Sequence, residues 1–219
     1  MSGLVPVGRY VRDLGASIDR LYENALDWEH LPHVHCGSFA AIDMIEAGPA
    51  GWTAEARLAD GRAIRLELAL DRPACRWVTR TSIGGRIASE IRSRAEATGP
   101  ETCRVTVDFA VADAIEEKRA GLGNYYRRLY AELYDEDERL MIPRAEAIRR
   151  GPKALKERRE VTLVDGSVHA MPRYCPHQGL PLDAEPDADG IVTCPWHGYR
   201  FDVHTGRNLG AQACGWTRA

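Results

Sequence analysis

The sequence lacks any apolar stretch long enough to cross a membrane, and its first residues lack the apolar segment of a secretory signal. It also lacks a strong excess of either charge, because its 219 residues carry a net charge of −3 with both signs interspersed. Nucleic-acid binding usually requires a basic stripe, which is not found in this chain. We therefore expect a cytoplasmic protein that binds neither membranes nor nucleic acid.

The cysteines lack a disulfide-like pattern. Four of the six are scattered, and we expect reduced thiols, most of them buried, at Cys36, Cys75, Cys103 and Cys214. No flavin or nicotinamide site is visible, so electrons for any redox chemistry would come from another protein. The apolar fraction of 44% is ordinary for a globular protein, and the length allows one large or two small domains.

The last third of the chain contains two short segments that each carry one cysteine and one histidine. Cys175-Pro-His177 is followed after sixteen residues by Cys194-Pro-Trp-His197. Zinc ribbons usually pair two cysteines in each segment, so a small zinc knuckle is the weaker interpretation. A [2Fe-2S] cluster whose irons take two thiolates and two imidazoles requires this mixture, with one ligand for each iron from each segment.

With Gly179 and Gly198 following the histidines, the two segments resemble the Rieske iron–sulfur domain over about residues 159–210. The resemblance implies a Rieske [2Fe-2S] cofactor, and its ligands would be Cys175, His177, Cys194 and His197. Rieske domains of respiratory complexes carry an extra disulfide in these segments, and neither segment here has a third cysteine. The chain therefore resembles the ferredoxin or oxygenase kind, for which low potentials are expected.

Residues from about Tyr10 to Trp28 have a three–four apolar spacing that predicts an amphipathic helix. Near its end, Asn24, Asp27 and His30 follow one another at intervals of three and share one strip beside the apolar face. Pro32 then breaks the regular helix. Polar groups in this position need a partner, since burying them unpaired costs several kcal/mol.

This stretch resembles the mononuclear-iron segment of Rieske non-haem iron oxygenases. That family has Asn, Asp three residues later, and two histidines with four residues between them, which here are Asn24, Asp27, His30 and His35. The resemblance implies that His30 and His35 bind Fe(II) and that Asp27 and Asn24 are catalytic. His33 is the substitute ligand, for which we expect a pocket or supporting role. The alternative is a metal-free histidine-rich helix end that closes a pocket.

Residues 39–111 are predicted to be almost entirely strand. Apolar and polar residues alternate, and Gly-Pro, Asp-Gly, Arg-Pro and Gly-Gly pairs separate the runs. The pattern predicts six antiparallel strands at about 39–47, 52–59, 63–71, 76–82, 86–98 and 102–111. One face is apolar, so a helix must cover it or the sheet must curl around a cavity.

A long helix is predicted from about Ile115 to Ile148, with an interruption at Gly121–Gly123 and a kink at Pro143 as options. Asp137 falls on its apolar stripe, whereas the neighbouring acidic residues are expected to form a solvated patch: Asp135, Glu136 and Glu138. An inward carboxylate is costly unless it is paired or binds a metal.

Two histidines and one carboxylate form the facial iron(II) triad, so Asp137 is the expected third metal ligand. The resemblance agrees, since the family's third ligand is an aspartate on the long helix after the sheet, often in a Glu-Asp pair. Glu146 is the substitute if the helical register changes after Pro143.

The order of helix, curled antiparallel sheet and long helix predicts an α+β chain with a helix-grip fold of the Bet v 1/START kind, followed by a small all-β Rieske domain. We expect a helix-grip domain with a mononuclear iron at 1–150, a linker at 151–160 and the Rieske [2Fe-2S] domain at 161–219. The Rieske part should open with two strands joined by the Asp-Gly turn at 165–166.

The resemblance implies the oxygenase component of a system that oxidises a small organic substrate, with aromatic compounds among the candidates, using O2. Electrons would come from an external NAD(P)H-dependent reductase or ferredoxin. The family places the cluster domain first and has a longer catalytic part, so both the domain order and the length of the catalytic part differ here.

In the family, an aspartate connects cluster and iron between subunits. Carried over to this chain, Asp27 would link His30 to His197 of a neighbouring chain in a homo-oligomer, with a trimer favoured.

A second hypothesis explains the short first domain. The chain would be a Rieske electron-transfer or redox-sensing protein whose helix-grip domain binds a small ligand without catalysis. Its weakness is that a binder has no evident need for Asp137 beside the histidines. A purely structural or partner-binding module is a third hypothesis, and it leaves the cluster without a purpose.

Overall fold

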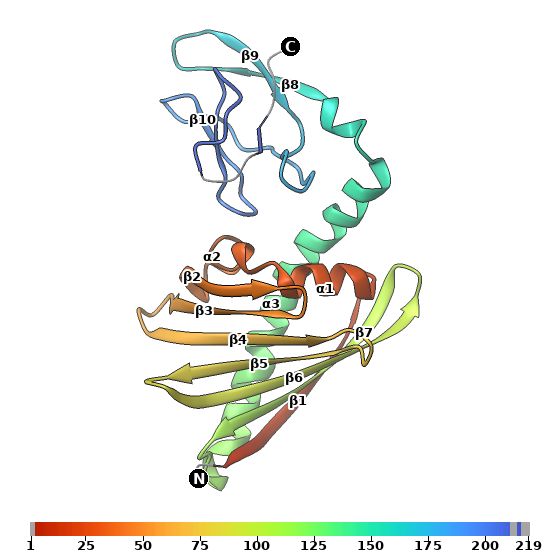
Figure 1. The fold of residues 1–219 in the computed structure, drawn as a ribbon, viewed down its shortest axis with the longest axis vertical. Coiled ribbons are helices and arrows are strands. Elements are labelled where there is room, and N and C mark those ends of the chain that lie inside the picture. Colours follow the sequence, from red (N-terminus) through yellow and green to blue (C-terminus); the bar gives the residue numbers. More distant parts are fainter. Residues whose placement is uncertain (1–2, 211–213, 216–219) are drawn as a thin grey trace. The chain divides into compact units, whose positions relative to one another are not determined.

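The computed structural model describes residues 3–210 and 214–215, which form two compact units, residues 1–141 and 142–219. No helix among these described residues is long and apolar enough to cross a membrane. The first unit is a curved sheet with helices on its concave side, and the second contains short strands and loops (Figure 1). Both the α+β class and the helix-grip arrangement that we expected are confirmed.

The chain begins with a strand, β1 (Leu4–Leu14), where the sequence predicted the start of a helix. This part of the prediction is wrong for a physical reason. Extended backbone is favoured by four residues of this segment: Val5, Val7, Tyr10 and Val11. The segment also pairs antiparallel with residues 103–112, the last strand of the first unit in chain order. This tertiary pairing outweighs the three–four apolar spacing that begins at Leu14.

The helical part of that stretch is shorter than predicted. Helix α1 (Ile18–Leu26) begins after Ser17, whose hydroxyl accepts a hydrogen bond from the backbone N–H of Arg20. A 3-10 turn, η1 (Trp28–His30), and a short helix, α2 (Leu31–Val34), follow, with Pro32 in the first turn of α2. The polar residues of interest therefore lie in a change of direction between α1 and the sheet.

The six predicted strands are all present. They are β2 (Phe39–Gly48), β3 (Gly51–Leu58), β4 (Ala63–Asp71), β5 (Arg76–Ile83), β6 (Arg86–Gly99) and β7 (Thr102–Ala112). With β1 they form one seven-stranded sheet in the order β1-β7-β6-β5-β4-β3-β2, and all neighbours are antiparallel. Alternate side chains of β3 and β4 are buried, which gives the sheet one apolar face.

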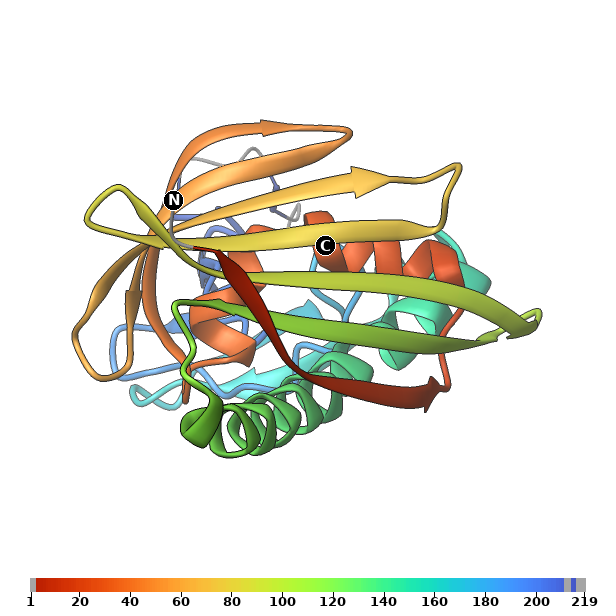
Figure 2. The ribbon, with the colours of Figure 1, turned by 90° about the horizontal axis from the view of Figure 1, so that it is seen from below.

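Helix α3 (Glu116–Arg150) covers this apolar face and, with α1 and α2, closes the concave side of the sheet (Figure 2). The helix is continuous through Gly121 and Gly123, so the optional glycine interruption is absent, and it continues through Pro143. Phe109 on β7 packs against Tyr126 and Tyr130, with ring centroids 5.2 and 5.1 Å apart. The apolar stripe of α3 is therefore directed at the sheet, as predicted.

The second unit has its own core. A 3-10 turn, η2 (Ala154–Lys156), precedes two antiparallel pairs, β8 (Arg158–Thr162) with β9 (Val168–Pro172) and β10 (Ile191–Thr193) with β11 (Arg200–Asp202). The predicted Asp-Gly turn joins β8 to β9, and its glycine, Gly166, has a φ of 82°.

All six cysteines lie among the described residues and are free thiols. Of the four outside the cluster motif, Cys103 is buried, Cys75 and Cys214 are partly buried, and Cys36 is exposed. The expectation that most of these four are buried is therefore wrong.

Candidate functional site

The first unit encloses a cavity of about 1050 Å³ between the concave face of the sheet, α1, α2 and α3. Aromatic side chains line it from both sides, with Trp52 and Trp77 on strands and Tyr126, Tyr130 and Tyr134 on α3. Asn24 and Asp27 line the cavity beside the three expected iron ligands, His30, His35 and Asp137. All five residues that the sequence assigned to the mononuclear site therefore line the same cavity.

The three expected metal ligands lie together although they come from distant segments. His30 is in η1, His35 follows α2, and Asp137 is on α3; their side-chain donor atoms lie within 4.8 Å of one another. Oδ1 of Asp137 is 2.9 Å from Nε2 of His35 and 3.6 Å from Nε2 of His30. All three residues are buried, being at most 8% exposed. Such a pocket of two imidazoles and one carboxylate suits a divalent transition metal.

Several buried polar atoms at this point have no hydrogen-bond partner among the described residues. They are Oδ1 of Asn24 and both ring nitrogens of His30. Leaving such atoms unpaired costs about 1–3 kcal/mol each. The residues present therefore fit a bound metal, which would accept the lone pair of one His30 nitrogen, better than they fit a metal-free helix end.

The charges at the site support the same interpretation. Burial alone would raise the pKa of Asp137, but the neighbouring imidazoles of His30 and His35 hold that pKa below its usual value. Burial alone would lower the pKa of His35, but its contacts with Asp137 and Glu136 raise it. The buried carboxylate is therefore ionised at neutral pH, as a metal ligand must be.

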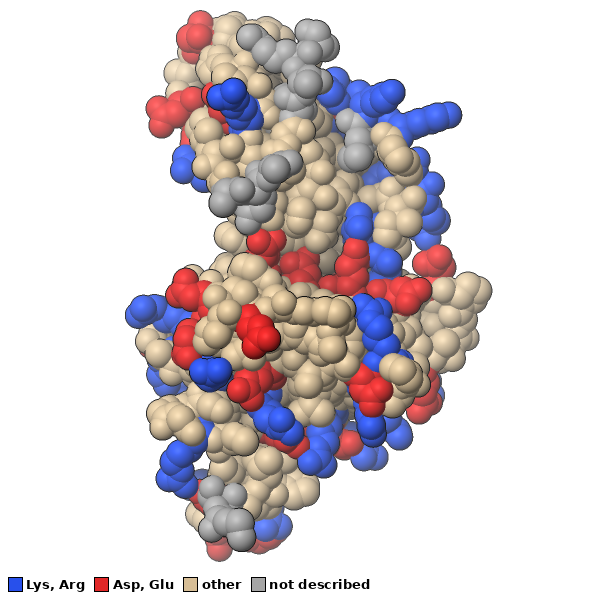
Figure 3. All heavy atoms as spheres, viewed as in Figure 1, with Lys and Arg blue, Asp and Glu red and all other residues tan. Residues whose placement is uncertain are grey.

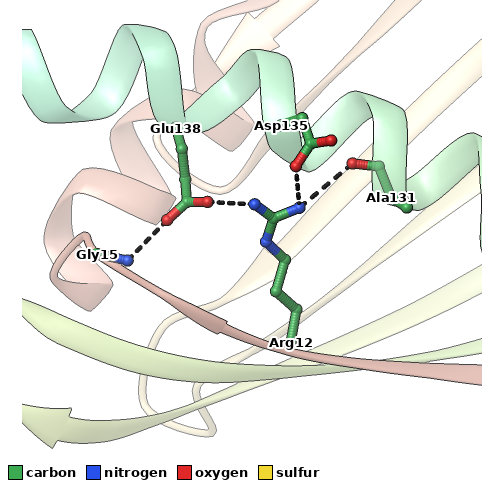
Figure 4. Close-up of polar contacts among 5 residues, drawn as sticks. All are labelled: Arg12, Gly15, Ala131, Asp135 and Glu138. Atoms are coloured by element: carbon green, nitrogen blue, oxygen red, sulfur yellow. Dashed lines mark hydrogen bonds and ion pairs between the residues drawn. The ribbon is translucent and has the colours of Figure 1, made fainter.

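The acidic residues around Asp137 are not the solvated patch that the sequence predicted. Oε2 of Glu136 lies 2.7 Å from Nδ1 of His35. Glu138 forms an ion pair with Arg12, and its other oxygen accepts the backbone N–H of Gly15 at 2.8 Å (Figure 4). Sequence reasoning missed these roles because the partners of these side chains lie far away in the chain.

Asp135 is exposed, as expected, yet it also pairs with Arg12 at 2.6 Å. The two substitute ligands are outside the ligand set. Glu146 and His33 are both exposed. Asp137 and His35 lie in the ligand set instead of these two substitutes. Asp27 ends α1, with its backbone N–H bonded to the carbonyls of Glu23 and Asn24.

The second unit brings its two cysteine–histidine segments together. In both, the cysteine N–H bonds to the carbonyl five residues later, and the glycine four residues later bonds back to the cysteine carbonyl, at 2.7–2.9 Å. These glycines, Gly179 and Gly198, have φ values of 72° and 66°, which L side chains rarely adopt. Two loops of matching shape therefore present their side chains in parallel.

The side chains of the two loops pair by type. Cys175 and Cys194 are buried and hydrogen-bonded to each other, and the rings of His177 and His197 have centroids 4.7 Å apart. The contact with Cys175 lowers the pKa of Cys194, and so do His197 and the backbone N–H groups near it, although burial opposes them. Thiol beside thiol and imidazole beside imidazole is the arrangement that a Rieske cluster requires, so these residues fit the group.

Comparison with known proteins agrees with this geometry. A family model described as the Rieske [2Fe-2S] domain matches residues 136–215, so the chain carries a Rieske domain, which implies an electron-transfer or iron–sulfur role. Apoptosis-inducing factor 3 from Mus musculus and its counterpart from Homo sapiens are each 45% identical to this chain over 42 residues. The match covers 19% of this chain and 7% of those proteins, so the chain spans only a small part of their length.

Solved structures resemble the helix-grip unit. The Zhui aromatase/cyclase from Streptomyces sp. R1128 has a TM-score of 0.55 and 13% identity, and the match covers 67% of this chain and 98% of the cyclase. A norcoclaurine synthase point mutant from Thalictrum flavum has a TM-score of 0.50 and 16% identity, with 65% and 98% covered. At such low identity these likenesses show the fold alone, which is a helix grip.

Proposed function

We propose that this chain is the oxygenase component of a Rieske non-haem iron system, which oxidises a small organic substrate with O2 and electrons from an external NAD(P)H-dependent reductase or ferredoxin. One observation carries the proposal: a buried set of two histidines and one aspartate lies in the wall of a ligand-sized cavity, in the same chain as a Rieske domain. When bound, a Rieske cluster supplies single electrons and a ferrous ion supplies the open positions at which O2 reacts.

The residues of the chain have separate tasks in this proposal. Cys175, Cys194, His177 and His197 would hold the cluster. His30, His35 and Asp137 would hold the iron, and their burial would exclude bulk water from it. Asn24 places an unpaired amide oxygen in the cavity wall, where it can orient a donor group of the substrate.

Asp27 has a different task. We infer that it links His30 to His197 of the partner subunit, so that the cluster of one chain serves the iron of another. This assembly, with a trimer favoured, rests on the family resemblance.

The cavity indicates what kind of substrate fits. Apart from the iron-site residues, its charged lining residues lie at the surface: Asp60 and Arg62 pair with each other at 2.7 Å, and Arg128 and Glu132 are exposed. The remaining lining is aliphatic, aromatic or hydroxylated. Such a cavity favours an uncharged, largely apolar molecule, and aromatic rings suit the tryptophans and tyrosines. Its volume accommodates more than one ring.

The second candidate function is a Rieske electron-transfer or redox-sensing protein whose helix-grip unit binds a ligand without catalysis. The cavity itself favours it, because ligand binding alone would use the aromatic lining. This candidate gives no reason for the buried Asp137 between two histidines.

The decisive experiment counts iron and acid-labile sulfide per chain after anaerobic purification with added Fe(II). The wild type is expected to hold about three irons and two sulfides, because a Rieske cluster accounts for two of each. His30→Ala and Asp137→Ala should lose the iron that has no matching sulfide, whereas Glu146→Ala, which removes an exposed carboxylate from the same helix, should keep it. A wild type that stops at two irons would favour the binding protein over the oxygenase.

A further inference from the structure

The His35 ring lies between two consecutive carboxylates of α3. Its Nε2 is 2.9 Å from Oδ1 of Asp137, and its Nδ1 is 2.7 Å from Oε2 of Glu136. Successive residues of an α-helix diverge by about 100°, so the two side chains can reach opposite edges of one imidazole. We propose that Glu136 is a positioning residue that fixes the tautomer and orientation of His35 for metal binding.

The chemistry of the ring carries this inference. A neutral imidazole has one N–H and one lone pair, and an ionised carboxylate can only accept a hydrogen bond. When Glu136 accepts the Nδ1–H of His35, the lone pair is left on Nε2, the nitrogen that faces Asp137 and the ligand set. A histidine that binds a metal commonly donates its other N–H to a carboxylate in this way.

Glu136 is not an alternative ligand for the same ion. Its oxygen contacts the edge of the His35 ring opposite to the one that Asp137 faces. His30 lacks an equivalent partner within the described parts of the chain, since its Nε2 lies 3.6 Å from Oδ1 of Asp137 and its Nδ1 makes no hydrogen bond. Of the two histidines, His35 is thus the one whose orientation the protein sets before a metal arrives.

This inference rests on the proposed metal centre, so its test must separate the two. Co(II) is a suitable probe on the full chain with its cluster, because elemental analysis distinguishes it from cluster iron. The Co(II) dissociation constant would be measured by equilibrium dialysis for the wild type, Glu136→Ala and Glu136→Gln. Glu117→Ala serves as the matched control, since it removes an exposed carboxylate from the same helix.

We expect Glu136→Ala to weaken Co(II) binding by about 10–100-fold, the usual cost of losing such a supporting carboxylate. Glu136→Gln, whose amide oxygen can still accept the Nδ1–H, should recover most of the affinity, and Glu117→Ala should match the wild type. Wild-type affinity in Glu136→Ala would overturn the role of Glu136. A wild type that binds no Co(II) would overturn the metal centre itself.

Discussion

At the scale of single residues, one close approach determines how near α3 can lie to the sheet. Gly123 is buried where α3 crosses β1, and a Cβ added there would lie 2.2 Å from the carbonyl oxygen of Val7. Gly8 contributes to the same crossing, since its own Cβ would meet the Cα of Gly123 at 3.1 Å. The absence of side chains at both positions allows helix and strand backbones to touch.

Gly123→Ala is therefore expected to destabilise the helix-grip unit by at least about 1–3 kcal/mol, because backbone atoms must move apart. Gly121→Ala is the control on the same helix: its Cβ would meet nothing within 4 Å, and alanine should gain up to about 1 kcal/mol from helix propensity. Urea unfolding of both variants, followed by tryptophan fluorescence, gives the comparison. Equal stability of the two variants would contradict the close approach.

Single-residue roles differ in how far the sequence reveals them. Helical phase was enough to direct Asp137 inward, because its neighbours at three and four residues are apolar. The same phase placed Glu136 in solvent, since a helical wheel contains no information about a histidine 101 residues away. Roles that depend on a contact between distant segments required the fold.

At the scale of secondary-structure elements, an ion-pair cluster fixes the rotation of α3 against β1. Arg12 projects from β1 between Asp135 and Glu138, and it also donates to the carbonyl of Ala131 at 3.3 Å (Figure 4). Because Asp135 and Glu138 flank Asp137 on the helix, this cluster also helps to hold the proposed metal ligand in place. The side chains of Arg12 and Glu138 are only 21% and 19% exposed to solvent.

Arg12→Ala should cost about 1–3 kcal/mol of unfolding free energy, between the values for exposed and fully buried pairs. It should also weaken Co(II) binding, because α3 can then rotate. Arg104→Ala is the control, because Arg104 forms a comparable ion pair with Asp13 across the same two strands, β1 and β7. Both of these side chains are at least half exposed, so the loss of unfolding free energy should stay below about 1 kcal/mol. Parallel urea titrations and dialysis measure both effects, and similar losses in the two variants would argue against the special role of Arg12.

Elements with a clear period were predictable, and β1 shows where the method fails. Strands β2 to β7 alternate between apolar and polar residues and are separated by turn residues, so their positions follow from the sequence. In β1, Pro6 and Gly8 coincide with a register shift against β7 that disturbs the alternation. Its pairing with β7, about a hundred residues away, determines its structure.

At the scale of the whole molecule, the chain combines two units whose functional groups the proposal connects. Lysine and arginine are interspersed with aspartate and glutamate over the face of the first unit drawn in Figure 3. The Rieske domain could be predicted from the two cysteine–histidine segments and their resemblance to that family, because each segment is local in sequence. The assembly that would bring cluster and iron together involves other chains, and a single sequence does not determine it.

Mixed assemblies test this last step. His30→Ala should remove the iron and His197→Ala the cluster, so neither variant should turn over alone. If cluster and iron act between chains, assemblies that carry both variants, purified through two different tags, should recover about a third of wild-type turnover, because a mixed cyclic trimer contains one intact cluster–iron pair among its three. Each variant mixed with the double variant should stay inactive, because no intact pair can then form. As a control, each single variant mixed with wild type should give active assemblies. If those assemblies are active and the assemblies of the two variants are not, electron transfer takes place within one chain and Asp27 has no bridging role.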